Sequence, residues 1–174
     1  IMGVKSKYEG YQSFQYLEAG DDFRPFKLTK GIGRVPEYLI PLAAEEEKRA
    51  GKIAKEIVFI SLHDHPVLFP EDMQDLLAYS REGRQHTAYA ALADSYYDCV
   101  FDNMMDGIGS ITSKSGWKWE ETLHDFGLRL ADLAHQDFAV KVEGVDDILR
   151  AHKEGRIGIV FGIEGAAPIE NELD

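Results

Sequence analysis

Residues 157–165 read Ile-Gly-Ile-Val-Phe-Gly-Ile-Glu-Gly, an almost uninterrupted apolar run that ends in a carboxylate. A run of this length without polar alternation is typical of a strand that is buried on both faces, as in parallel sheets. Residues 57–62 form a second such run, Ile-Val-Phe-Ile-Ser-Leu, and His63 and His65 follow it closely. We therefore expect two buried strands, each leading directly into side chains that can bind a metal ion.

Helical patterns lie between and around these runs. Residues 119–136 carry apolar side chains at three- and four-residue intervals, and residues 145–154 form a shorter helix that Gly155 is placed to end. Weaker patterns predict helices over 42–56, from Pro70 to Gly83 and over 86–93, and short strands over 97–102 and 138–142. Strands that alternate with helices predict a parallel sheet, so the expected fold class is α/β.

The chain divides into two regions. Residues 1–41 lack helical or strand periodicity and read as an irregular arm lying on the body, and 42–56 form an exposed, charged helix. Residues 57–174 carry the strand and helix patterns. With 174 residues, of which 44% are hydrophobic, the chain is long enough for one packed domain and too short for two of ordinary size.

Composition excludes several classes of partner. The 31 acidic and 19 basic residues give a net charge of -12 without a basic cluster, so we expect no nucleic acid. No apolar run approaches the roughly 18 residues that span a bilayer, so we expect no membrane partner. Cys99 is the only cysteine, which excludes an intrachain disulfide and a cysteine-rich zinc module and favours a cytoplasmic location.

The strand ends predict a metal site. Side chains alternate across a strand, so His63 and His65 point the same way, whereas Asp64 faces the opposite side and is a poor ligand candidate. Imidazole nitrogen and carboxylate oxygen are ligands that zinc accepts, and a carboxylate can bridge two ions. We expect His63, His65 and Glu164 to bind two divalent cations, with zinc preferred, and Glu164 to serve as the bridging, catalytic carboxylate.

A family resemblance extends this prediction. Residues 162–171, Gly-Ile-Glu-Gly-Ala-Ala-Pro-Ile-Glu-Asn, with the preceding Ala-His-Lys-Glu-Gly-Arg-Ile of 151–157, resemble the renal (membrane) dipeptidase family of the amidohydrolase superfamily. The order of elements over 57–174 is similar as well. The resemblance implies a (β/α)8 TIM-like barrel with a two-zinc site at the carboxyl ends of its strands. Such a barrel needs about 250 residues, so this chain would form its amino-terminal portion, with the remainder supplied by another segment or chain.

Some residues match the family pattern, and others depart from it. His63 matches the histidine that follows the family's first strand, and Glu164 matches its bridging glutamate. His65 stands where the family has aspartate, although His-x-His is common elsewhere in the superfamily. Ala166 and Ala167 stand where the family reads Gly-His after the Glu-Gly pair.

The metal ligands and the resemblance together predict a metal-dependent hydrolase. Its substrate would be a small molecule with an amide bond, by resemblance a dipeptide, attacked by a metal-bound hydroxide. Two alternatives stay open: a non-hydrolytic relative such as a metal-dependent decarboxylase, and a catalytically inactive subunit that keeps the fold. Association into a homo-oligomer is also left open.

Overall fold

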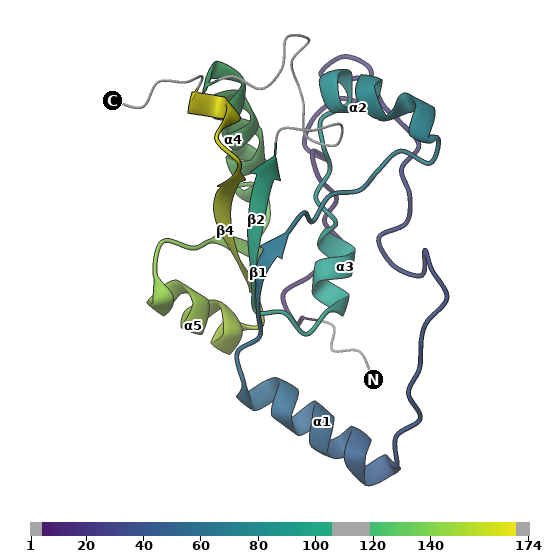
Figure 1. The fold of residues 1–174 in the computed structure, drawn as a ribbon, viewed down its shortest axis with the longest axis vertical. Helices are drawn as coiled ribbons and strands as arrows, with labels where there is room; N and C mark the ends of the chain where they lie inside the picture. Colours follow the sequence, from purple (N-terminus) through teal and green to yellow (C-terminus); the bar gives the residue numbers. More distant parts are fainter. Residues whose placement is uncertain (1–4, 106–118, 170–174) are drawn as a thin grey trace.

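A computed structural model describes residues 5–105 and 119–169. Its centre is a sheet of four parallel strands, in the order β1-β2-β4-β3, with helices between the strands along the chain (Figure 1). The strands are β1 (Ile60–Asp64), β2 (Cys99–Met105), β3 (Ala139–Lys141) and β4 (Ile157–Glu164). The predicted α/β class with a parallel sheet is confirmed.

The helices follow the predicted order, although the one expected from Pro70 begins as an α-helix only at Leu76. They are α1 (Ala44–Glu56), α2 (Leu76–Glu82), α3 (Tyr89–Asp94), α4 (Trp119–Leu133) and α5 (Val145–Glu154), with 3-10 turns η1 (Met73–Asp75) and η2 (Ala167–Ile169). Helix α4 ends at Leu133, three residues before the predicted end at Gln136. The Gln136 side chain donates to the carbonyls of Leu133 and Ala139, which satisfies the end of α4 and starts the turn into β3.

The first strand begins later than the sequence indicates. Residues 57–59 were expected in it, but the Ile57 N–H donates to Ile53 as the cap of α1. The Phe59 N–H donates to the Asp98 carboxylate at 2.9 Å. Because these two N–H groups donate hydrogen bonds outside the sheet, β1 starts at Ile60 and runs through His63 to Asp64.

The order of the strands brings β1 close to β4. Along one edge, β4 pairs with β2 over seven residues. Along its outer edge, β4 pairs with β3 only at its first three residues, Ile157–Ile159. Only β2 therefore separates β1 from β4 (Figure 1). Among the described residues the strands form an open sheet, and no strand lies beside residues 160–164 on that outer edge.

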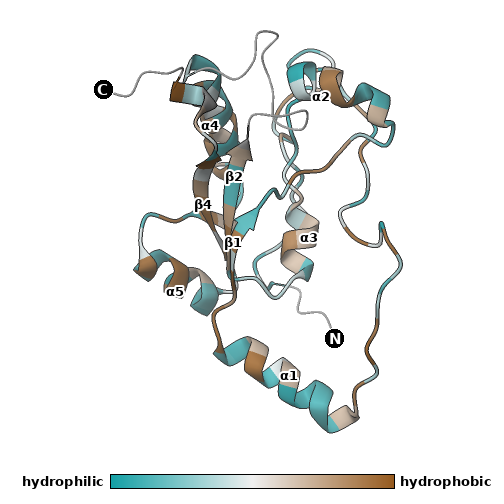
Figure 2. Ribbon diagram, viewed as in Figure 1, coloured by the Kyte–Doolittle hydropathy of each residue, from teal (hydrophilic) through white to brown (hydrophobic). Residues whose placement is uncertain are grey.

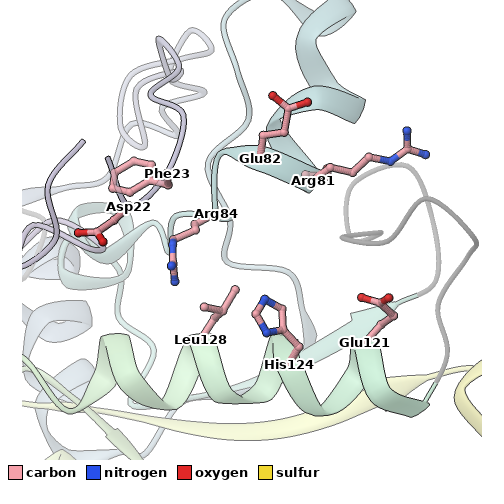
Figure 3. Close-up of a pocket in the computed structure, with 9 residues that line it drawn as sticks. Asp22, Phe23, Arg81, Glu82, Arg84, Glu121, His124 and Leu128 are labelled. Atoms are coloured by element: carbon pink, nitrogen blue, oxygen red, sulfur yellow. The ribbon is translucent and has the colours of Figure 1, made fainter. Parts of the chain in front are cut away.

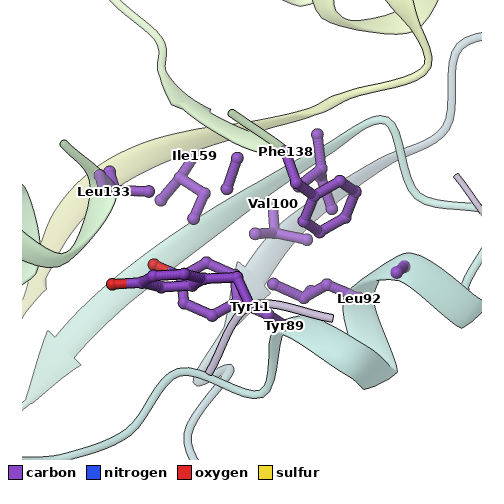
Figure 4. Close-up of a cluster of buried hydrophobic side chains, with 10 residues drawn as sticks. Tyr11, Tyr89, Leu92, Val100, Leu133, Phe138 and Ile159 are labelled. Atoms are coloured by element: carbon purple, nitrogen blue, oxygen red, sulfur yellow. The ribbon is translucent and has the colours of Figure 1, made fainter. Parts of the chain in front are cut away.

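One face of the sheet carries the hydrophobic core. Val100, Ile157 and Ile159 are fully or almost fully buried there, and they pack against Tyr11 of the arm and Tyr89 of α3 (Figure 4). Tyr11, from the segment predicted to be an irregular arm, is thus part of this core. Burial in this core raises the pKa values of the Tyr11 and Tyr89 hydroxyls.

A buried carboxylate fastens the arm to the core. Asp132, at the end of α4, is 1% exposed. Its Oδ1 accepts from the Tyr11 hydroxyl at 2.7 Å and from the Phe14 N–H at 2.8 Å, and its Oδ2 accepts from the Tyr89 hydroxyl at 3.0 Å. These three hydrogen bonds join α4, the arm and α3 at one point.

Helix α1 contributes nothing to the core. It has no buried residue, as predicted for a solvated helix, and in Figure 1 it lies apart from the sheet. In Figure 2 much of the α1 ribbon has the colour of hydrophilic residues, in contrast to β4.

Two glycines in helical segments are expected to respond oppositely to alanine. Gly155 ends α5 with a φ of +68°, and a Cβ there would lie 2.1 Å from the Ser6 hydroxyl. Gly51 lies inside α1 with open space around it. We expect Gly155→Ala to lower the free energy of unfolding by about 1–2 kcal/mol and Gly51→Ala to leave it unchanged or raise it by up to about 1 kcal/mol. Urea denaturation measures both, and equal effects would contradict the assigned left-handed cap.

Candidate metal centre

The structure brings together the three side chains predicted from the strand ends. The Nε2 atoms of His63 and His65 lie 3.2 Å apart, and the Glu164 Oε2 lies 3.1 Å from the first and 3.4 Å from the second. They are the one group of three or more metal-ligand side chains within reach of a common ion in the described parts of the chain. Residues about 100 positions apart in sequence thus meet at the carboxyl edge of the sheet.

A register shift in β1 helps these side chains converge. Ser61 pairs with Val100 and Asp64 with Asp102 of β2, so the pairing slips by one residue between Ser61 and Asp64. With Asp64 on the face of Asp102, the histidines on either side of it reach the other face, where Glu164 lies. The Asp64 carboxylate turns back to accept from the His65 N–H at 2.9 Å. Asp64 lies outside the three-residue cluster, as predicted.

The spacing of the three atoms fits a tetrahedral ion. Bonds of about 2.0–2.1 Å from zinc to nitrogen or oxygen place neighbouring ligand atoms roughly 3.3–3.4 Å apart. The observed triangle has sides of 3.1, 3.2 and 3.4 Å. Two imidazoles and one carboxylate also match the ligand types of catalytic zinc sites, which keep a further position open. The residues present therefore fit a divalent cation.

The cluster is accessible from solvent. The side chains of His63, His65 and Glu164 are 58%, 36% and 43% exposed. All three side chains are therefore open to solvent. The Glu164 Oε2 lies within 3.4 Å of both histidine Nε2 atoms.

A buried ion pair lies on the opposite face of the sheet. Asp102 of β2 is 2% exposed, and its Oδ2 lies 2.9 Å from the Arg129 Nη1 on α4. Burial raises the pKa of Asp102, while the charges of Arg129 and His65 act in the opposite direction. The sequence patterns did not predict this pair. The available signal was a charged side chain, Asp102, inside a largely apolar strand.

A separate hollow lies between the arm, α2 and α4. It has a volume of about 230 Å³ and is lined by charged side chains including Arg81, Arg84, Glu82 and Glu121 (Figure 3). Glu82 is already paired with Arg24, at 3.0 Å. None of the three predicted ligands lines this hollow, so it is distinct from the candidate metal centre.

Comparison of the chain with protein-family models, curated proteins and solved structures gave no match. In the described residues, no helix combines the length and apolarity needed to cross a bilayer.

Proposed function

We propose that this protein is a metal-dependent hydrolase that cleaves an amide bond of a small substrate, by resemblance a dipeptide. The observation that carries the proposal is the near-equilateral triangle of His63, His65 and Glu164 ligand atoms. Supporting it are the position of these residues at the carboxyl edge of a parallel sheet and their exposure to solvent, both of which are usual for active sites of α/β enzymes.

Each residue has a defined part in the proposed site. His63, His65 and Glu164 would hold one cation, and Glu164 is the residue that would also serve a second one. A bound cation would supply Lewis acidity, which polarises an amide carbonyl and makes water more acidic. Solvent access to all three side chains admits the substrate.

The proposal includes an incomplete barrel. A four-stranded parallel sheet is compatible with the amino-terminal portion of a (β/α)8 barrel, and the apolar side chains of Leu62 and Ile163 are 73% and 40% exposed near its open edges. Exposed apolar surface of this kind favours a covering partner. The partner segment, the dipeptide substrate and the cytoplasmic location all remain predictions.

Removal and return of the metal tests the proposal. After dialysis against a chelator, we expect the complete enzyme, with any partner segment it requires, to lose hydrolysis of a dipeptide panel, and one to two equivalents of Zn²⁺ to restore it. Hydrolysis that survives chelation, or a metal-loaded enzyme that cleaves no member of the panel, would refute the dipeptidase assignment.

The number of bound cations separates the two enzymatic alternatives. Two bound cations per chain, both weakened by Glu164→Gln, favour the hydrolase, because a bridging carboxylate serves two ions. A single cation with the same ligands favours the decarboxylase. An inactive subunit is favoured if the parent protein shows no turnover and His63→Ala abolishes its assembly with a partner.

A further inference from the structure

Asn103 of β2 lies between the strands that carry the predicted ligands. The sheet order places β2 between β1 and β4, which are therefore two strand spacings, roughly 10 Å, apart. The histidine and glutamate side chains bridge that distance, so their ligand atoms meet above β2. Strand order and register therefore place Asn103 between the two strands that carry the ligands.

The side chain of Asn103 belongs to the same face as the ligands. Asn103 pairs with Gly162, and a Cβ built on Gly162 would lie 2.3 Å from the Asn103 Oδ1. The amide therefore extends across Gly162 on the face to which Glu164, two residues further along β4, also points. Only a glycine at 162 leaves room for this position of the amide.

The side-chain amide of Asn103 has no hydrogen-bond partner in the described parts of the chain. It is half-buried, and no hydrogen bond or ion pair joins its side chain to another described residue. An amide offers two N–H donors and a carbonyl acceptor, and leaving them unused in a partly buried place is unfavourable. A molecule bound at the metal centre would offer a hydrogen-bond partner to this amide.

We propose that Asn103 is a substrate-positioning residue, whose amide hydrogen-bonds an oxygen of the molecule held by the cation. This inference rests on the proposed function and names one more residue of the same site. Asn103 is assigned to the substrate instead of the metal because the two imidazoles and the carboxylate are zinc-type ligands, whereas amide oxygen suits harder cations such as Ca²⁺.

The experiment uses Co²⁺ as a coloured substitute for zinc and acetohydroxamate as an oxygen-donor probe, with both affinities read from the absorption spectrum. We expect Asn103→Ala to leave the Co²⁺ affinity within about threefold of the parent and to weaken acetohydroxamate binding about tenfold, or about 1.4 kcal/mol. Gly162→Ala should act in the same direction by displacing the amide. Asn103→Asp should weaken the anionic probe further through charge repulsion. Gln74→Ala, at an exposed amide in η1, is the control and should change neither affinity.

Each contrary result has its own meaning. Unchanged acetohydroxamate affinity in Asn103→Ala overturns the positioning role and leaves the proposed function in place. A tenfold or greater loss of Co²⁺ affinity overturns it as well, because Asn103 would then be a ligand. A parent protein that binds no Co²⁺ contradicts the proposed function itself, and with it this inference.

Discussion

Glu164→Ala is expected to lower the Zn²⁺ affinity of the protein by roughly a hundredfold or more. Removing an outer partner of a metal ligand already costs about 10- to 100-fold, and Glu164 would be a direct ligand whose Oε2 lies within 3.4 Å of both histidine Nε2 atoms. His63→Ala should have an effect of similar size. Competition with a chromophoric chelator measures both affinities.

Asp64 provides the matched control within the same triplet. It lies between the two histidines in sequence but faces the opposite side of the sheet, and its carboxylate accepts from the His65 N–H. Asp64→Ala should change Zn²⁺ affinity less than about fivefold. If Asp64→Ala weakens binding as much as Glu164→Ala does, the alternation of the strand does not decide which side chains bind, and the proposed ligand set is wrong.

Asp132→Ala is expected to lower the free energy of unfolding by about 3–5 kcal/mol. The substitution leaves the buried hydroxyls of Tyr11 and Tyr89 and the Phe14 N–H without their acceptor, and each such unsatisfied group costs about 1–3 kcal/mol. Asp132→Asn keeps one acceptor oxygen and should cost less. Urea denaturation followed by circular dichroism measures both losses.

The neighbouring exposed residue is the control for this prediction. Asp137→Ala removes a carboxylate from the surface four residues after the end of α4, and we expect a change within about 0.5 kcal/mol. Equal stabilities of Asp132→Ala and Asp137→Ala would mean that the arm is not fastened through Asp132. Limited proteolysis adds a second measurement, because cleavage near Tyr11 should become faster only in the Asp132 variant.

Local patterns predicted the parts of the structure that depend on nearby residues. The bounds of α5 follow from its apolar spacing and from Gly155, which alone in that segment accommodates the left-handed cap. The convergence of His63, His65 and Glu164 follows from two strand endings and the parallel sheet. The bounds of α5 need only the period of a helix, whereas the facing of the histidines also depends on the register shift between Ser61 and Asp64, which strand period alone does not predict.

Contacts between distant segments account for what the sequence did not predict. The start of β1 is set by Asp98, 39 residues after Phe59, and the arm is held by Asp132, 121 residues after Tyr11. Neither aspartate has a neighbouring pattern that identifies its partner. The position of β3 at the outer edge of β4 likewise depends on which strands pair. A strand of three residues contains too short a pattern to predict its pairing partner.

The short pairing of β3 has a consequence for how the proposed activity would arise. Among the described residues, β3 covers only Ile157–Ile159, so no described strand pairs with the outer edge of β4 beside Glu164. A segment docking on that edge would extend the sheet and reach the carboxylate in a single step. Under the proposed function, activity would then rise with the concentration of the docking segment until saturation.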